Sequence, residues 1–392
     1  MPEHTILSLG AENKACFSVF HNGELFTSPV FGDLTVFDNL NRFERAVREY
    51  LGENKICPRY IVCDTHPDYV SASFAEKLHS ENEGSVLLRV QHHFAHIAAC
   101  MEDNGLDEEV TGVSFDGTGY GTDGKSWGGE FFLCSRKGFR RSYHLKYMPQ
   151  PGGDIAAFEV WRMALAYLYD AYGDYDSIPI FPFLERVGRK KADLIHAMID
   201  KNINCPVTSS MGRLFDAVAS LTGISDVSRK EAEAAIALEK EAEEGVSESY
   251  GYDLVLDEID VSAMTGMIVD DLRRGTRPGV ISSKFHNTVG NIIFDMSLKI
   301  RGSFGTVKTV VSGGCFQNRY LVKYLTEKFR ASGMGLYVHR KYAATDENIS
   351  LGQAVLAAGM EPGLSARRHG GGSPEEAVSY AGEYDMKGFK GA

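Results

Sequence analysis

Residues 110–134 read VTGVSFDGTGYGTDGKSWGGEFFLC, which is two β-type runs joined by a glycine-rich segment. The first run covers residues 110–115, and the second ends in the apolar letters EFFLC. The chain opens in a similar way, because residues 5–30 hold two apolar runs punctuated by Gly10 and by Asn22-Gly23. Asn-Gly between β-type segments is a hairpin signal. Two such hairpins, each opening one half of the chain, predict a duplicated α/β lobe with a cleft between the copies.

Strand-like and helix-like segments alternate outward from these hairpins, which is typical of α/β domains. We expect strands at residues 59–63, 86–90, 128–134, 307–312 and 335–338, and helices at 67–80, 92–104, 318–331 and 348–360. Residues 150–300 are mostly helical by the spacing of their apolar side chains. We therefore predict an N-terminal lobe over residues 1–108, a C-terminal lobe over 109–361 with a helical insertion at about 150–275, and a weakly packed tail over 362–392.

The composition excludes several classes of protein. The chain has 392 residues, of which 43% are hydrophobic and 24% charged, enough for two packed lobes. Its net charge of -12 disfavours nucleic-acid binding as the main task. No apolar run approaches the ~20 residues of a membrane span, and the N-terminus lacks a signal-peptide layout, so we expect a cytoplasmic protein. Seven cysteines without a CxxC pair predict reduced thiols rather than disulfides or zinc fingers.

A pair of histidines in the segment VQHHFAHIAAC has metal-ligand spacing. His92 and His96 are four positions apart on a predicted helix, so both rings point the same way and two imidazoles can bind one divalent metal. Two ligands hold a metal weakly, and Asp346, in a loop before a predicted helix, is the candidate for the third. His93 points off that face. The alternative is a pair of helix histidines that pack or form hydrogen bonds.

The segment FDGTGYGTDG is the first of two candidate phosphate-binding loops. Asp116 lies at a strand end and can orient a metal-bound water or a magnesium-bound nucleotide. Glycines let the backbone approach an anion closely. The glycines in question are Gly117, Gly119, Gly121 and Gly124. The segment matches neither GxGxxG nor a P-loop, and the alternative is a tight hairpin that needs glycines for its turn.

The second candidate loop is VVSGGCFQNRYL, a strand, a Gly-Gly turn and a helix. This arrangement aims backbone N–H groups and a helix N-terminus at an anion. Gly313 and Gly314 permit a flat base or a ribose to lie against the backbone, and Gln317 and Asn318 can hydrogen-bond a ligand. The alternative is a plain β–α turn. Near the N-terminus, Lys14 follows a strand turn and can pair with a phosphate charge, although a lone lysine there is more often merely exposed.

Seven segments of the chain, in order, resemble the carbamoyltransferase core of the HypF family. They are HPDYVSASFA, VQHHFAHIAA, DGTGYGTDGKSWGGEFF, PGGDIAAFEVWRMALAYL, SSMGRLFDAVASLTG, SGGCFQNRYL and ISLGQA, within residues 5–360. The resemblance implies the two-lobed actin/sugar-kinase/Hsp70-like (ASKHA) fold, which TsaD tRNA-modification enzymes and antibiotic O-carbamoyltransferases share. HypF proteins make the carbamoyl group that becomes a cyanide ligand of [NiFe]-hydrogenase.

The resemblance also implies a reaction and the residues for it. Carbamoyl phosphate and ATP give carbamoyl-adenylate, and the TsaD-like core passes the carbamoyl group to the C-terminal cysteine of HypE. By resemblance, His92, His96 and Asp346 would be ligands of iron or zinc, with magnesium on the nucleotide. By resemblance too, the nucleotide contacts would be Asp116 with its glycines, Gly313, Gly314 and Asn318, and His286 in KFHNTVGNI would face the adenosine site. None of the seven cysteines is expected to be the nucleophile, because the partner supplies the thiol.

The chain departs from the family pattern at several points. We find no segment like the acylphosphatase, zinc-finger or YrdC-like domains of full HypF. The chain is therefore expected to be either an excised or stand-alone core, or a protein whose partner domains, including a YrdC-like adenylating protein, are separate chains. The family's Asp-Gly-Gly before SLGQ reads Asp346-Glu347-Asn348, which predicts a stiffer loop with an added charge. Three alternatives stay open: an O-carbamoyltransferase acting on a small hydroxyl compound, a TsaD-type tRNA-modification enzyme, and a non-catalytic nucleotide-binding assembly module.

Overall fold

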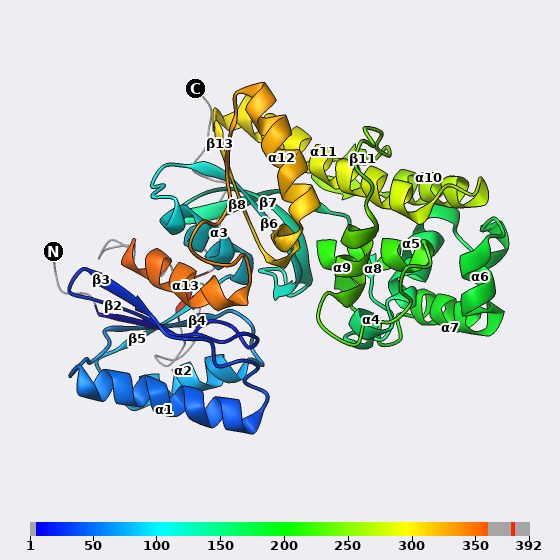
Figure 1. Cartoon of the computed structure of the whole chain (residues 1–392). Coiled ribbons are helices and arrows are strands. Elements are labelled where there is room, and N and C mark those ends of the chain that lie inside the picture. Colours follow the sequence, from blue (N-terminus) through cyan, green and yellow to red (C-terminus); the bar gives the residue numbers. More distant parts are fainter. Residues whose placement is uncertain (1–4, 360–377, 381–392) are drawn as a thin grey trace.

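The computed structural model describes residues 5–359 and the backbone of residues 378–380. Two β-sheets lie one above the other, with helices between them and on their outer faces, and a separate group of helices extends to one side (Figure 1). Among the described residues, no helix combines the length and the apolar character needed to cross a membrane.

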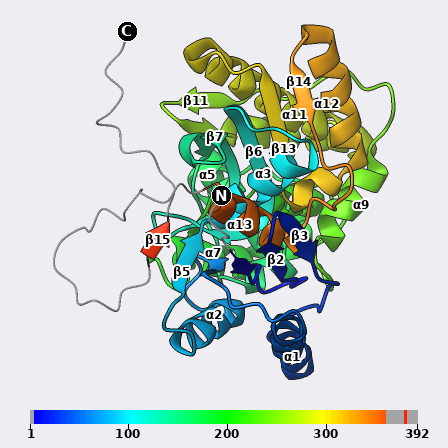
Figure 2. The same ribbon diagram turned by 90° about the vertical axis from the view of Figure 1, so that its left-hand side faces the viewer.

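The first sheet has the strand order β15-β5-β4-β1-β2-β3. Its strands are β1 (Ile6–Ser8), β2 (Ser18–His21), β3 (Glu24–Thr27), β4 (Tyr60–Asp64), β5 (Val86–Val90) and β15 (Val378–Tyr380). Strand β15 pairs in parallel with β5 at the edge of the sheet, as the view in Figure 2 shows. The rest of the predicted tail over 362–392 lies outside the described residues.

The second sheet has the strand order β11-β12-β8-β7-β6-β13-β14, with two short strands beside it. Its strands are β6 (Val110–Tyr120), β7 (Ser126–Ser135), β8 (Gly138–Leu145), β9 (Met148–Pro149), β10 (Val207–Thr208), β11 (Asp253–Val255), β12 (Glu258–Asp260), β13 (Lys308–Ser312) and β14 (Gly335–Tyr337). Strand β6 is longer than expected, because the segment predicted to be a glycine-rich turn stays in the strand as far as Tyr120.

The two sheets share one topology, which confirms the duplicated two-lobed α/β fold. The order β5-β4-β1-β2-β3 in the first sheet corresponds to β14-β13-β6-β7-β8 in the second. In each copy the first three strands are antiparallel, and the remaining two add in parallel to the first. The strand pattern therefore shows the duplication that sequence identity between the halves is too low to prove.

The helices follow the same duplication. They are α1 (Phe37–Glu53), α2 (Val70–Ser80), α3 (His92–Asp103), α4 (Ile155–Phe158), α5 (Trp161–Tyr172), α6 (Pro182–Val187), α7 (Arg189–Asp200), α8 (Met211–Leu221), α9 (Glu233–Glu241), α10 (Ser262–Arg273), α11 (Pro278–Phe304), α12 (Arg319–Ser332) and α13 (Ile349–Ala358). Helices α2 and α12 follow corresponding strands, as do α3 and α13. The helices from α4 to α11 lie between β8 and β13, and the corresponding connection of the first copy, between β3 and β4, holds only α1. The predicted boundaries of the domains stay predictions.

Helices α3 and α13 form the layer between the two sheets (Figure 1). Helix α3 contacts β6 and β13 of the second sheet, and α13 contacts β1, β2 and β4 of the first. The two helices also pack against each other, where Gly352 of α13 lies so close to the backbone of α3 that a β-carbon would collide with the carbonyl oxygen of Ala95. This contact joins the two lobes and brings the start of α3 near the start of α13.

We expect Gly352→Ala to lower the free energy of unfolding by about 1–3 kcal/mol, because the added methyl group must push α3 and α13 apart. The matched control is Gly302→Ala in α11, where no described atom lies within 4 Å of an added β-carbon. That change should leave stability unchanged or raise it by up to about 1 kcal/mol. Chemical denaturation of the two variants checks this, and equal stabilities would show that the two helices can separate without cost.

Candidate functional site

Asp116 leaves the ladder of the second sheet at a β-bulge. The register between β6 and β7 jumps from Phe115 opposite Gly129 to Gly119 opposite Trp127. Bulges bend a strand and redirect side chains, and they are frequent beside active sites. Asp116 Oδ1 accepts hydrogen bonds from its neighbour, the N–H of Gly117, at 2.7 Å and from the N–H of Gly314 at 3.3 Å.

The start of helix α8 holds the bulge in place from outside. The hydroxyl group of Ser210, the N-cap of α8, donates to the carbonyl oxygens of Gly117 at 2.6 Å and Asp116 at 3.1 Å. Gly212 packs closely there, because an added β-carbon would lie 2.9 Å from the α-carbon of Gly117. The segment SSMGRLF therefore holds the backbone around Asp116 in place.

The histidine pair lies in the first turns of α3, directly after strand β5. Gln91 caps the helix by accepting a hydrogen bond from the N–H of Phe94. Both imidazole rings are buried, and their centroids are 5.0 Å apart. The four-residue spacing therefore places both rings on one face, as predicted. His93 is buried as well, on a different face, and its ring lies against Gly119.

Four side chains from distant parts of the chain meet at one point. One ligand atom each of His92, His96, Asp116 and Asp346 lies within 4.8 Å of the others. His96 Nε2 is 3.1 Å from Asp116 Oδ2 and 3.5 Å from Asp346 Oδ1. His92 Nε2 is 3.6 Å and 3.7 Å from the same two oxygens. The structure thus brings the three predicted ligands together and adds Asp116 to them.

The environment of His92 suits a metal ligand. Asp64, at the end of β4, accepts a hydrogen bond from His92 Nδ1 at 2.8 Å, so Nε2 is the ring atom left to face a metal. Within the described chain, this buried Nε2 atom has no hydrogen-bond partner. Buried polar atoms are seldom left unpaired, and two imidazoles with carboxylates are ligands that suit iron(II) or zinc. The residues present therefore fit a divalent metal.

The charges within the cluster shift its pKa values. Burial by itself would lower the pKa of His92, but Asp64, Asp116 and Asp346 raise it well above its ordinary value. Burial would likewise raise the pKa of Asp116, but the two imidazoles hold it well below its ordinary value. The cluster therefore holds partly exposed, ionised carboxylates beside two buried imidazoles, and a bound cation would stabilise these carboxylates further.

The glycines of the first candidate loop have different surroundings. A β-carbon at Gly119 would lie 2.5 Å from His93 and 2.9 Å from His92, and one at Gly121 would collide with Trp127. These two glycines are required for packing, which favours the tight-hairpin alternative at their positions. Gly117 differs, because no described atom lies within 4 Å of a β-carbon added there. Gly117 is thus the position where a ligand can approach the backbone.

The second candidate loop has one glycine that packing requires and one that is partly exposed. Gly313 has φ +102°, and a β-carbon there would collide with the carbonyl oxygen of Phe115. Gly314 has an ordinary φ, and its N–H points at Asp116. Gln317 is exposed, and its amide group donates to the carbonyl oxygen of Gly314 at 3.3 Å. Gly314 and Gln317 therefore lie on the accessible side of the turn.

His286 and Asn318 form a buried pair. Asn318 caps α12 by accepting from the N–H of Leu321, and its amide nitrogen lies 2.8 Å from His286 Nε2. The other nitrogen of His286 donates to the carbonyl oxygen of Ser282 at 2.7 Å. Burial lowers the pKa of His286 to about 4, so the ring is neutral. In this structure His286 contacts the amide nitrogen of Asn318. That His286 faces an adenosine stays a prediction.

Lys14 bridges the two halves of the structure. Its ammonium group lies 2.8 Å from the carboxylate of Glu231, which precedes α9. Burial alone would lower the pKa of Lys14, but Glu231 and then Asp346 and Asp116 raise it. The cation is therefore near the cluster, as its predicted role with a phosphate requires, and it is held by a carboxylate that an anionic ligand could replace.

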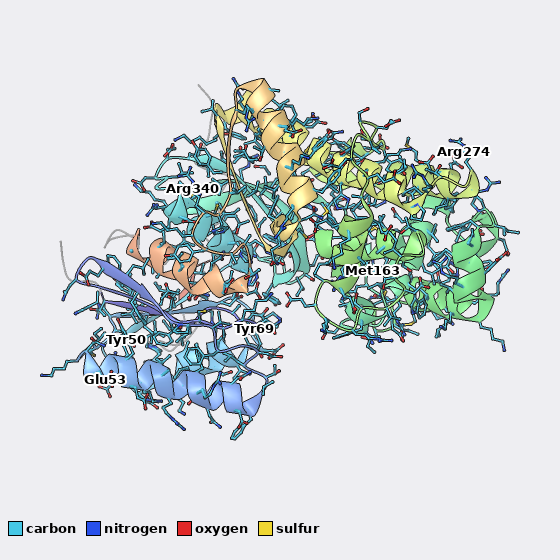
Figure 3. All side chains as sticks on the ribbon, in the orientation of Figure 1. Tyr50, Glu53, Tyr69, Met163, Arg274 and Arg340 are labelled. Atoms are coloured by element: carbon cyan, nitrogen blue, oxygen red, sulfur yellow. The ribbon has the colours of Figure 1, made fainter. Side chains whose placement is uncertain are left out.

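Local patterns did not identify three residues beside the cluster. Asp64 could have been identified as a candidate site residue, since it is a carboxylate at the carboxyl end of a predicted strand. His66 and Tyr69 belong to the HPDY segment, and their rings stack with centroids 4.1 Å apart. Tyr69 lies on the side of the first lobe that faces the helical group (Figure 3). Burial raises the pKa of Tyr69, and the charges of His92, Asp64 and Asp346 act on it, so its hydroxyl group is close to the cluster.

Comparisons with known proteins identify the family of the chain. Residues 1–103 match the family model of a HypF Kae1-like domain, and residues 112–353 match that of the second subdomain of a carbamoyltransferase Kae1-like domain. A carbamoyltransferase HypF homolog of Cupriavidus necator is 32% identical over 90% of this chain and 91% of its own length. Carbamoyltransferase HypF of a Synechocystis species is 32% identical over 89% of this chain and 46% of its own length.

Two solved structures superpose on most of the chain. The crystal structure of full-length HypF in the phosphate- and nucleotide-bound form has a TM-score of 0.83 and 38% identity, over 91% of this chain and 56% of that one. The crystal structure of T. kodakarensis HypF has a TM-score of 0.80 and 26% identity, over 91% and 48%. The chain thus spans nearly all of the first relative and about half the length of the others.

We expect purified protein to bind one divalent metal ion, iron or zinc, and both His92→Ala and His96→Ala to lose it. Each substitution removes one of two imidazole ligands and leaves the carboxylates with a single nitrogen partner, too few ligands to hold the ion tightly. Elemental analysis of the three proteins after equal treatment checks this, with thermal unfolding as the control for folding. Equal metal content in all three would remove the histidines from the site.

Proposed function

The chain belongs to the HypF carbamoyltransferase family, and on that premise we propose that it transfers the carbamoyl group of carbamoyl-adenylate to the C-terminal cysteine thiol of a HypE-like acceptor protein. The product would be the precursor of a cyanide ligand in [NiFe]-hydrogenase maturation. The observation that carries the proposal is the cluster of two imidazoles and two carboxylates, which lies between the two glycine turns at the junction of the lobes.

The nucleotide part of the substrate would lie against the second lobe. A full-length HypF protein has been solved with phosphate and nucleotide bound, which supports nucleotide binding by this chain. Gly117 and Gly314 lie beside Asp116, and their N–H groups donate to its Oδ1 atom. Lys14 offers a cation that an anion can take from Glu231, and a lysine is a suitable partner for a phosphate.

The residues of the cluster would act on the carbonyl end. His92, His96, Asp116 and Asp346 would hold a divalent cation, which when bound supplies Lewis-acid polarisation of a carbonyl or phosphoryl oxygen. The acceptor thiolate forms a bond to the carbamoyl carbon, and the bond from that carbon to the phosphate oxygen breaks. AMP leaves with the electron pair on its phosphate. Lys14, whose ammonium group pairs with Glu231 in the absence of a ligand, would neutralise that charge.

The intermediate would come from an adenylating activity outside these 392 residues. Carbamoyl-adenylate requires an adenylating step, and the chain spans about half of relatives such as the Synechocystis protein. We therefore expect the 392-residue chain alone to release little pyrophosphate from ATP and carbamoyl phosphate. Adding a YrdC-like protein should yield HypE carbamoylated at its C-terminal cysteine, detected by mass spectrometry of the intact acceptor.

Each other result of that assay points to a different function. Pyrophosphate release by the chain alone would mean that one site performs both steps. Carbamoylation of a small hydroxyl compound but not of HypE would favour an O-carbamoyltransferase. Nucleotide binding without transfer to either acceptor would favour a non-catalytic assembly module. Carbamoylation of HypE with unaltered rate by the His96→Ala variant would exclude the cluster from catalysis.

We also expect Gly314→Val to weaken ATP or ADP binding about tenfold, a change of about 1.4 kcal/mol. A side chain there covers the backbone and places a β-carbon 3.0 Å from Asp116 Oδ1, whereas the ordinary φ of Gly314 adds no backbone strain. Calorimetric titration measures the affinity, and Gly302→Val, which points into open space, is the control. Normal affinity in Gly314→Val would place the nucleotide elsewhere.

A further inference from the structure

Asn348 lies at the start of a helix, but its side chain does not form the usual capping hydrogen bond with any described residue. It ends the short 3-10 turn Asp346–Asn348 and is the N-cap residue of α13. Asparagine at this position commonly caps the helix through its side chain. In the part of the chain that the structure describes, Asn348 makes no such bond, and its side chain is buried at 1% exposure. The side chain is therefore committed to other partners.

The contacts of Asn348 fix which way its amide group points. The nitrogen donates to the carbonyl oxygen of Ala343 at 2.7 Å, and a carbonyl oxygen can only accept. The same nitrogen lies 3.1 Å from His339 Nε2, which is also 2.9 Å from the hydroxyl group of Ser312. The amide nitrogen must therefore face Ala343 and His339, and the amide oxygen must face the opposite way.

The amide oxygen of Asn348 faces His96. It lies 3.1 Å from His96 Nδ1 in a fully buried contact between residues 252 positions apart. Since an amide oxygen only accepts, this contact requires a proton on His96 Nδ1. On the other side of the ring, Nε2 lies within hydrogen-bond distance of Asp116 Oδ2, at 3.1 Å, and 3.5 Å from Asp346 Oδ1. A cation bound between these groups would take the place of the Nε2 proton, and the proton that remains would be the one on Nδ1 that a neutral side chain accepts.

We infer that Asn348 is a positioning residue of the metal site, which fixes the tautomer and ring orientation of His96. Asp64 makes the corresponding contact to His92, so the two imidazoles are held by different groups, one ionised and one neutral. Asn348 also lies in the same 3-10 turn as Asp346. One short segment therefore supplies a carboxylate ligand and orients an imidazole ligand from the other lobe.

This inference rests on the metal part of the proposed function, and its test measures metal binding rather than carbamoyl transfer. The probe is cobalt(II), followed through its visible absorption during titration of the full chain stripped of metal. Asn348→Leu removes the acceptor for His96. Asn348→Asp keeps an acceptor for His96 but, like leucine, cannot donate to Ala343 or His339.

The matched control is Asn287→Leu in α11. Asn287 is also fully buried, donates to the carbonyl oxygens of Val246 and Glu248 and accepts from the hydroxyl group of Tyr320. The substitution Asn287→Leu therefore removes a similar set of hydrogen bonds at a position outside the cluster. Thermal unfolding of all variants without metal measures the structural cost by itself.

We expect Asn348→Leu to bind cobalt(II) about 10–100-fold more weakly than the wild type, with an altered spectrum. Asn348→Asp should recover most of the affinity, and Asn287→Leu should keep it while losing thermal stability. Wild-type affinity and spectrum in Asn348→Leu would overturn the inference, as would an equal loss in Asn348→Asp, because the role would then be structural only.

The outcome is separable from that of the proposed function. A wild-type chain that binds cobalt(II) with the expected dependence on Asn348 but never carbamoylates HypE leaves this inference standing and removes the proposed acceptor. A wild-type chain that binds no cobalt(II) overturns the role of Asn348 directly.

Discussion

The close contact between α3 and α13 is the constraint on which the candidate site depends. Each helix follows the last parallel strand of its own copy, and each carries part of the cluster at its start. Gly352 lets the backbones approach at Ala95, which sets the distance between His96 on one helix and Asp346 before the other. The cluster is thus built across the axis that relates the two copies, and neither lobe contains it alone.

The two copies have diverged, and each contributes different residues to the cluster. The hairpin of the second copy contains the bulge that turns Asp116 toward the cluster, and its connection after β8 holds the helices from α4 to α11. One of these, α8, fixes the bulge through Ser210. The first copy keeps a short connection with α1 and contributes Asp64, Lys14 and the histidines. The second lobe therefore supplies Asp116 and Asp346 to the cluster, and the first supplies the imidazoles.

Much of this could be predicted from the sequence, because it depends on local spacing. The alternating segments gave the α/β fold, and the four-residue spacing gave the common face of His92 and His96. The role of Asp116 within the cluster was not predicted, since it depends on a register shift between two strands. Gly119 and Gly121 looked like anion-binding glycines, yet their neighbours His92, His93 and Trp127 come from pairings that a linear pattern does not contain. Asn348 stood out only as a departure from a family pattern, and its contact with His96 spans 252 positions.

That separation along the chain has a consequence for how the protein acquires a metal. Contacts between distant residues carry a large loop-closure entropy and form late in folding, when the topology of the whole domain is nearly complete. Four elements must all be in place before the four ligands converge. They are strand β1, helix α3 with its histidines, the bulge at Asp116 and helix α13. A metal ion that needs all four ligands would therefore bind only after both lobes have closed. A chain stalled during synthesis before Asp346 would hold both imidazoles and Asp116 without the fourth ligand, and this incomplete geometry would select poorly among divalent ions.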